Sequence, residues 1–177
     1  MIKLKSMIKE DTNSPNIIFP DWLTEKIKRV HTSSGQGSIF SMNAEKIKEI
    51  VLRIVQNEHN VEKIANSTGV IQKDIPNVGY DLVVTKETAN TLPNAEFSTV
   101  EKEEGNGKIQ VNAVKTSLSK EKFKTNKLTI IVRPQKDDTN KPIPNSYIIL
   151  SAFPGEIGVD KRASEWGNDF FVVIPSN

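Results

Sequence analysis

Apolar residues recur at helical spacing in the first half of the chain. A first amphipathic helix is predicted from Pro20 to about His31, because proline is tolerated at the start of a helix and apolar residues follow at intervals of four and three. A second helix is predicted after Ser41 or Asn43, either of which can cap it. Its apolar face consists of Ile47, Ile50, Val51 and Ile54. A third helical segment, 61–66, is expected to stop where a glycine supplies a left-handed turn.

From Gly79 onward the pattern changes to short runs that are rich in β-branched and aromatic residues and are separated by turn-forming residues. These runs predict strands at 80–85, 97–101, 109–114, 128–133, 147–153 and 170–174. The sequence Glu104-Gly105-Asn106-Gly107 indicates a hairpin between two of them, and 117–124 favours a short helix. Long loops are expected at 136–145 and 155–168, where function often lies.

Helices followed by strands predict an α+β fold, with the N-terminal helices packed on one face of a C-terminal antiparallel β-sheet of about five strands. We expect a flexible N-terminal tail over 1–16 and a single domain over 17–177. Within this domain the helical half is expected to span 17–75 and the sheet half 79–177. The fold prediction therefore excludes a parallel βαβ order.

The composition narrows the chemistry. The 177 residues include no cysteine, which excludes a disulfide framework, a zinc ribbon and a cysteine nucleophile. Because there are two histidines, a metal site would depend mainly on carboxylates, and we expect neither a metal nor a cofactor. No stretch approaches the ~18 apolar residues of a membrane span, so a soluble protein is predicted.

Charge is unevenly distributed, although the formal net charge is only +2. Between Lys108 and Lys141 there are nine lysine and arginine residues and three acidic residues, a local net charge of +6. Such a run is typical of solvated strand faces and loops. It is also what a phosphate-binding face requires.

Only two side chains titrate near neutral pH without a perturbing environment, His31 and His59. His31 lies at a predicted helix end, before a loop of hydroxyl residues and glycines whose amides could face an anion. It is therefore a candidate for proton transfer, and the alternative is a histidine that interacts with the helix dipole. His59 lies in a polar turn and is interpreted as structural.

Two late strands carry polar candidates. Arg133 ends an apolar strand and is followed by Pro134, which places the guanidinium at the sheet rim, where it could bind a phosphate with two hydrogen bonds. Ser151 is the hydroxyl in an otherwise apolar run and needs a hydrogen-bond partner if it is buried. The alternatives are a surface salt bridge for Arg133 and a bond to the backbone for Ser151.

The chain resembles the metal-independent RNase toxins of the barnase, EndoU, colicin tRNase and RelE-like superfamily. It shares with them a helical half that contains a histidine, a strand that ends in arginine, and a later strand of the form apolar-apolar-Ser-small-aromatic-Pro. The residues that carry the resemblance are His31, Ile131-Val132-Arg133-Pro134 and Ile149-Leu150-Ser151-Ala152-Phe153-Pro154-Gly155. It covers roughly residues 20–155.

The resemblance implies an endoribonuclease toxin that cleaves RNA by transesterification without a metal. It makes His31 the general acid or base, Arg133 a clamp on the scissile phosphate and Ser151 a hydrogen-bond donor to phosphate or base. The expected substrate-binding residues are Lys115, Lys127, Thr129 and Phe153. It further implies RNA, tRNA included, as the substrate, a cognate inhibitor or immunity protein as a partner, and action in the cytoplasm after delivery from another cell or a phage.

Other functions are less well supported. The chain lacks a Walker or Rossmann phosphate loop and a serine-hydrolase elbow. A helix-turn-helix can be drawn over 61–70, but Pro76 would interrupt its second helix. The main alternative is a non-catalytic binding module, such as an immunity protein, an adaptor or a phage accessory protein.

Overall fold

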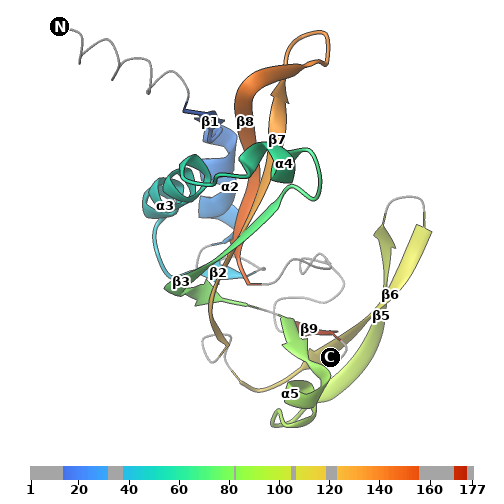
Figure 1. The fold of residues 1–177 in the computed structure, drawn as a ribbon. Coiled ribbons are helices and arrows are strands. Elements are labelled where there is room, and N and C mark those ends of the chain that lie inside the picture. The colour runs from blue at the N-terminus through green and yellow to red at the C-terminus, as the bar shows by residue number, and fades with distance from the viewer. Residues whose placement is uncertain are drawn as a thin grey trace, which may run out of the picture. The chain divides into compact units, whose positions relative to one another are not determined.

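The structure is a computed structural model that describes residues 14–31, 38–81, 83–104, 107–118, 123–155 and 170–174. Within these residues the protein has a mixed α+β fold with four helices and nine strands, which confirms the predicted fold class (Figure 1). The chain divides into two compact units. Unit 1 comprises Met1–Glu25, Ala44–Ile71 and Ile130–Ala152, and unit 2 comprises Lys26–Asn43, Gln72–Thr129 and Phe153–Asn177.

The three helices predicted from the apolar pattern are confirmed. They are α2 (Asp21–Val30), α3 (Ala44–Gln56) and α4 (Val61–Ala65). The buried face of α3 consists of Ala44, Ile47, Val51 and Val55, at intervals of three, four and four. After α4, Gly69 adopts a positive φ of 68° and its amide donates to the carbonyl of Ile64 at 2.8 Å, which is the expected left-handed turn.

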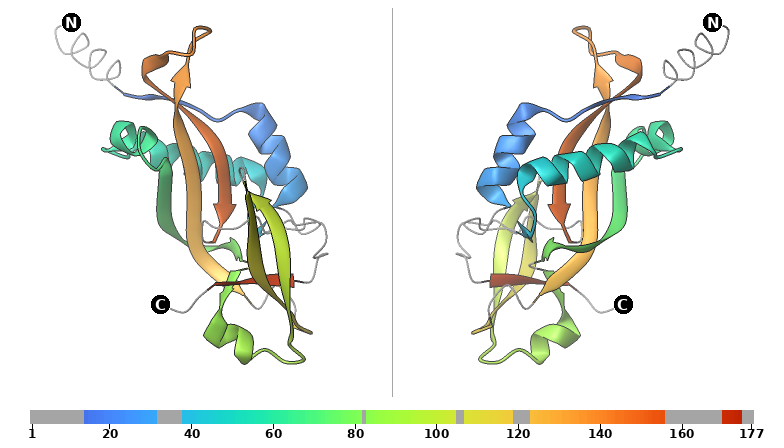
Figure 2. Two further views of the ribbon diagram at one scale, coloured as in Figure 1. Left: turned by 90° about the vertical axis from the view of Figure 1, so that its right-hand side faces the viewer. Right: turned by 90° about the vertical axis from the view of Figure 1, so that its left-hand side faces the viewer.

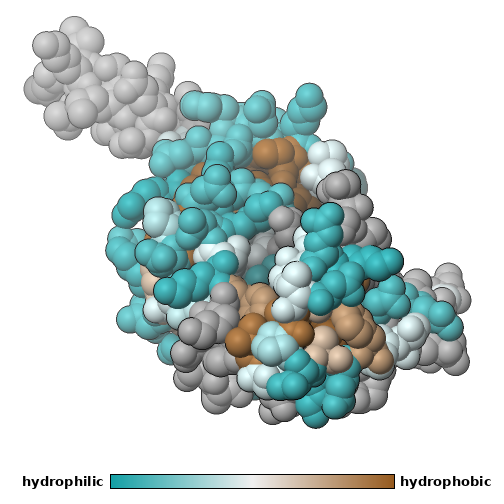
Figure 3. Space-filling view, turned by 90° about the horizontal axis from the view of Figure 1, so that it is seen from below, coloured by the Kyte–Doolittle hydropathy of each residue, from teal (hydrophilic) through white to brown (hydrophobic). Residues whose placement is uncertain are grey.

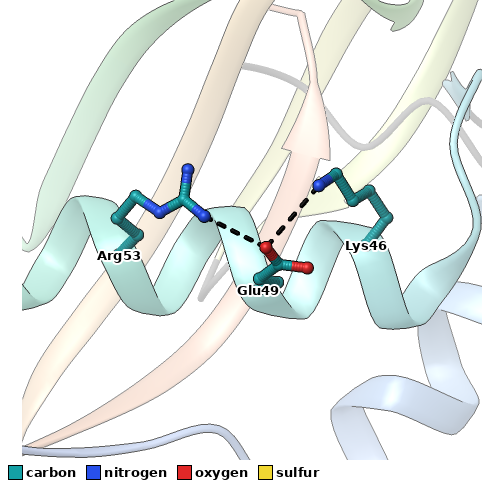
Figure 4. A network of polar contacts seen from close by, with 3 residues as sticks. All are labelled: Lys46, Glu49 and Arg53. Carbon is teal, nitrogen blue, oxygen red and sulfur yellow. Dashed lines mark hydrogen bonds and ion pairs between the residues drawn. The ribbon is translucent and has the colours of Figure 1, made fainter.

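Charged side chains stabilise the solvent face of α3. Glu49 Oε1 pairs with Arg53 Nη2 at 3.0 Å and with Lys46 Nζ at 3.6 Å (Figure 4). The three residues stand three and four positions apart, so their side chains meet on one side of the helix. All three are more than half exposed, and each pair therefore contributes only about 0.3–0.5 kcal/mol.

The larger sheet has five strands in the order β1-β8-β7-β3-β2. Its strands are β1 (Asn16–Ile18), β8 (Pro142–Pro154), β7 (Lys124–Lys136), β3 (Val70–Tyr80) and β2 (Ile39–Phe40). The sheet is mostly antiparallel, with β1 parallel to β8 and β2 antiparallel to β3. The two long strands β7 and β8 run side by side in both views of Figure 2, joined by a hairpin. The packing of the N-terminal helices on one face of this sheet stays a prediction.

A second sheet is a departure from the single sheet that the sequence predicts. It has four strands in the order β4-β9-β6-β5. They are β4 (Val83–Thr85), β9 (Phe170–Ile174), β6 (Gly107–Lys115) and β5 (Glu96–Glu104). The expected hairpin is confirmed, because β5 and β6 pair antiparallel up to Glu104 and Gly107. Strand β4 pairs parallel with β9, so the expectation of antiparallel pairing throughout is wrong here as well as at β1.

The expected start of strand structure near Gly79 is also wrong, because β3 already begins at Val70 and both β1 and β2 lie in the expected helical half. Three of the first seven residues of β3 are polar and exposed, Gln72, Lys73 and Asp74, and Pro76 follows them after one isoleucine. A strand with this composition has no alternation of apolar and polar residues to reveal it. Asn16, the last residue of the expected tail, pairs with Ser146.

Strands β7 and β8 extend further than predicted, which reduces the expected loop 136–145 to five residues, 137–141. Asp137 holds this turn together. Its Oδ1 accepts hydrogen bonds from the hydroxyl and the amide of Thr139 at 2.7 and 2.8 Å and from the amide of Lys141 at 3.0 Å. Asn140 has the positive φ of 64° that such a turn needs. These polar contacts close a hairpin where the sequence indicates a loop.

A short helix follows β4 that the sequence pattern does not predict. It is α5 (Lys86–Asn90), and Thr85 caps it by accepting a hydrogen bond from the amide of Thr88 at 3.2 Å. Around it unit 2 has a small core of Val84, Ala89, Leu92 and Val114. The expected helix at 117–124 lies partly outside the described residues, and Lys124 begins β7. The tail over 1–13 and the loop over 156–168 also lie outside them.

Figure 3 shows one face, on which polar residues predominate and apolar residues emerge in a few places. The most exposed large apolar side chains among the described residues are Phe97 and Trp22, at 56% and 51%. None of the described helices has the length and apolar content to cross a membrane.

Candidate functional site

The predicted site residues divide between the two units. His31, Lys115, Lys127, Thr129 and Phe153 belong to unit 2. Arg133 and Ser151 belong to unit 1.

His31 follows the last residue of α2 and is held on several sides. Its amide donates to the carbonyl of Ile27 at 2.9 Å, and its own carbonyl accepts from the amide of Phe40 at 2.9 Å. The imidazole ring meets Phe40 edge-on, with ring centres 5.8 Å apart, and stacks on Phe153 with centres 6.5 Å apart. The side chain is buried, with 9% of the residue exposed. These contacts give the ring one orientation.

The hydrogen bond of His31 determines its tautomer. Nδ1 lies 2.7 Å from the backbone carbonyl oxygen of Ser38. A carbonyl oxygen only accepts hydrogen bonds, so Nδ1 carries the hydrogen. In the neutral ring the lone pair is then on Nε2, which is the nitrogen able to take up a proton.

Three further predicted residues are connected to this place through Gly155, at the end of β8. The Gly155 amide donates to the carbonyl of Lys127 at 2.8 Å, and the Thr129 hydroxyl donates to the Gly155 carbonyl at 2.7 Å. Phe153, which stacks on His31, lies two residues before this glycine. The structure therefore brings together the side chains of His31, Thr129 and Phe153 and the backbone of Lys127, and we call these four residues the His31 cluster.

The Thr129 hydroxyl is used within the fold. The residue is fully buried, and its Oγ1 also accepts from Gln72 Nε2 at 3.3 Å. Because its one hydrogen goes to Gly155, the hydroxyl has none left for a phosphate. Its observed role is to position the Gly155 backbone. Its predicted contact with substrate stays a prediction.

Asp81 is a buried carboxylate at the same place, and the sequence analysis does not identify it. It is 8% exposed, and its carboxyl group occupies the position that a Cβ on Gly155 would need. Gly155 has a φ of 98°, which also favours glycine. The signal in the sequence is weak, because Asp81 stands in no motif. It adds an acidic group beside the His31 cluster.

Lys115 lies in the four-stranded sheet. It is the exposed last residue of β6 and stands opposite Glu96 of β5 and Phe170 of β9 in the strand register. Its position at a strand end agrees with the sequence prediction. Its role as a second phosphate-binding cation stays a prediction.

In unit 1, Arg133 supports a turn. Its Nη1 donates to the carbonyls of Thr68 and Val132, at 3.2 and 2.9 Å. The arginine is half-buried, as is Ser151 on the neighbouring strand β8. The surface salt bridge considered for Arg133 is therefore replaced by bonds to backbone oxygens. Its action on a phosphate stays a prediction.

Unit 1 also contains a cavity of about 430 Å³. It is lined by polar side chains from the end of α3, the start of α4 and β8: Gln56, Glu58, His59, Glu62, Asn145 and Tyr147. His59, interpreted from the sequence as structural, is thus part of a cavity wall. Among the described residues, no group of three or more histidine, aspartate or glutamate side chains is arranged to hold a metal ion.

Comparison with protein-family models, with curated proteins and with solved structures finds no match to this chain.

Proposed function

We propose that the protein is an endoribonuclease that cleaves RNA by metal-independent transesterification, with His31 as the group that transfers the proton. The observation that supports this most is the hydrogen bond from Nδ1 of His31 to the Ser38 carbonyl, which leaves Nε2 as the proton acceptor. The imidazole of His31 stacks on Phe153, an aromatic ring of the kind that stacks on bases, and the backbone of Lys127 is bonded to Gly155, two residues further along the chain.

The chemistry needs few protein groups because RNA supplies its own nucleophile. Nε2 of His31 takes the proton of a 2′-hydroxyl, and the 2′-oxygen forms a bond to the adjacent phosphorus. The bond from phosphorus to the 5′-oxygen then breaks, that oxygen takes a proton from water, and the proton on His31 is released to solvent. The products are a 2′,3′-cyclic phosphate and a 5′-hydroxyl. Lys127 would stabilise the extra negative charge of the transition state.

The remaining parts of the proposal follow from the resemblance. RNA, tRNA included, is the substrate, a cognate inhibitor or immunity protein is the partner, and the site of action is the cytoplasm of a cell that the toxin reaches from another cell or a phage. The N-terminal helices would cover one face of the five-stranded sheet, as their apolar faces predict, and leave the other face to RNA.

The test is cleavage of end-labelled RNA by the full chain in EDTA, with identification of the new ends. His31→Asn is the informative variant, because the asparagine amide can still donate to the Ser38 carbonyl but provides no titratable nitrogen. We expect its rate to fall about 10²- to 10⁴-fold. Glu49→Gln, on the solvent face of α3, is the matched control and should cleave like the unmodified chain. Thermal unfolding shows whether each variant is folded.

A folded His31→Asn variant that cleaves at the unmodified rate would overturn the mechanism, as would cleavage of a strand whose 2′-oxygens are methylated. Activity should also fall as salt rises, because phosphate contacts release counterions.

A non-catalytic binding module is the second candidate. It is favoured by the burial of His31 and by the bonds of Arg133 to backbone oxygens, since both are ordinary structural roles. A folded chain that leaves every RNA tested intact would support this function.

A further inference from the structure

The cavity of unit 1 is built from two segments that are far apart in the sequence. Gln56, Glu58, His59 and Glu62 come from the end of α3 and the start of α4, and Asn145 and Tyr147 come from β8. Its volume of about 430 Å³ falls within the range of pockets that bind small molecules. It belongs to a different unit from the His31 cluster, and its chemistry is argued independently of the proposed ribonuclease activity.

Tyr147 provides the first indication of a ligand. The residue is 5% exposed, and no hydrogen bond joins its hydroxyl to another described residue. Its oxygen is not fully enclosed, because the fully buried side-chain oxygen without a partner among the described residues is Thr24 Oγ1. Because Tyr147 lines the cavity, a group inside the cavity can supply a hydrogen-bond partner for its hydroxyl.

The charges of the cavity wall indicate which kind of chemical group the cavity would bind. The acidic lining residues are Glu58 and Glu62, and no described lining residue is a lysine or arginine. Glu62 makes no ion pair with a described residue, whereas Glu58 Oε1 accepts from the Asn60 amide at 3.3 Å. The negative charge of Glu62 also acts on the Tyr147 phenol, so the two groups lie near each other. Such a cavity attracts a cation and repels a phosphate.

The amide side chains of the wall are oriented by the N-terminal part of the chain. Gln56 Nε2 donates to the carbonyl of Pro15 at 3.1 Å, and Asn145 Nδ2 donates to the carbonyl of Ser14 at 3.2 Å. Since carbonyl oxygens only accept, these bonds determine which end of each amide is the NH₂ group. Gln56 Oε1 is then a further acceptor in a wall that already contains two carboxylates.

We propose that this cavity binds a primary ammonium or guanidinium group, with Glu62 as the counter-charge and the Tyr147 oxygen and Gln56 Oε1 as hydrogen-bond acceptors. Both kinds of cation carry several N–H donors and match a wall that is rich in acceptors. The tyrosine ring adds an aromatic surface, which also attracts cations. The group could arrive on a free alkylamine or on the lysine or arginine side chain of a peptide.

The experiment is titration of the full chain with 1,4-diaminobutane, with the amide of N-acetyl-lysine and with the amide of N-acetyl-arginine, followed by calorimetry or by the NMR signals of Tyr147. The amide of N-acetyl-norleucine is the uncharged control. We expect at least one cation to bind and the norleucine compound not to bind. Preference for the diamine or for the amino-acid amides distinguishes a free amine from a peptide side chain.

Glu62→Gln and Tyr147→Phe should each weaken binding at least about tenfold, because each removes one interaction of 1.4 kcal/mol or more. Glu49→Gln, another acidic residue of unit 1 outside the cavity, should leave binding unchanged. Absence of binding by every cation, equal binding of norleucine, or full binding by folded Glu62→Gln and Tyr147→Phe variants would overturn the proposal. Tighter binding of inorganic phosphate would overturn it too.

Discussion

Nη1 of Arg133 occupies the space that a β-carbon on Gly69 would fill. From there it reaches the carbonyls of Thr68 and Val132, while the Gly69 carbonyl accepts from the Val132 amide at 2.8 Å. The glycine is required twice, once for its φ of 68° and once for the room it leaves to the guanidinium. Gly69 therefore joins the turn after α4 to strand β7 through its backbone, and it can do so because it has no side chain.

Gly69→Ala is expected to destabilise the protein by at least about 1–2 kcal/mol, the cost of a left-handed conformation for alanine, with an added penalty from the displaced arginine. Urea unfolding measures the change. Gly107→Ala is the matched control, since a β-carbon there meets nothing within 4 Å, and it should change stability by less than about 0.5 kcal/mol. Equal stability of the two variants would contradict the role assigned to Gly69.

Asp137 should make the β7–β8 hairpin sensitive to acid. Its pKa is lowered mainly by the hydrogen bond from the Thr139 hydroxyl and then by that from the Lys141 amide. A carboxyl whose pKa is lower in the folded chain adds stability above its unfolded-state pKa of about 3.9, and this stability is lost as pH falls through the lowered value. Thr139→Ala should raise the pKa of Asp137, and Thr139→Ser should preserve it.

NMR titration of the Asp137 carboxyl carbon measures this effect. Asp138→Asn removes the neighbouring exposed carboxylate, which makes none of the turn hydrogen bonds described here, and should leave the lowered pKa nearly unchanged. If Thr139→Ala leaves the Asp137 titration where it was, the turn is held by other contacts.

Tyr147 should ionise late. Burial first, and then the negative charge of Glu62, raises the pKa of its phenol above 10.0. Because the pKa is higher in the folded chain, the tyrosine contributes stability that is lost as pH rises through the folded-state value. Glu62→Gln should lower the pKa of Tyr147 without restoring the usual value, since burial remains.

The absorbance of the phenolate measures this titration. The chain has a second tyrosine, Tyr80, so the difference between the unmodified chain and Tyr147→Phe gives the part of the absorbance change that belongs to Tyr147. An unchanged alkaline titration in Glu62→Gln would show that the carboxylate does not act on the phenol.

The sequence predicts the helices and the longer strands because their apolar residues repeat with the period of the element. The face of α3 and the runs that form β7 and β8 are examples. It does not predict β3, whose exposed segment includes Lys73 and Asp74, nor the two-residue strand β2. These two strands form because neighbouring strands in the sheet pair with them. A local sequence pattern does not show which distant segments will become those neighbours.

The candidate site, like the fold, has residues that the sequence identifies and residues that it does not. The resemblance identifies His31 and Phe153, and the structure stacks their rings. Asp81 and the cavity residues escape sequence reasoning because no spacing relates them. Tyr147 is about 90 residues from the α3–α4 turn in the sequence, and the two line one cavity only in the folded chain. Glu58 and His59 lie in a polar segment that resembles an ordinary solvent-exposed turn.

The position of β9 has a consequence for biosynthesis. This strand lies between β4 and β6, and it pairs with both. Until residues 170–174 have been synthesised, β4 lacks its neighbour in this sheet and β6 lacks one of its two neighbours, and open strand edges invite pairing with other chains. The four-stranded sheet therefore closes only after nearly all of this sequence has been translated. A nascent or truncated chain that ends before β9 should aggregate or be degraded more readily than the full chain.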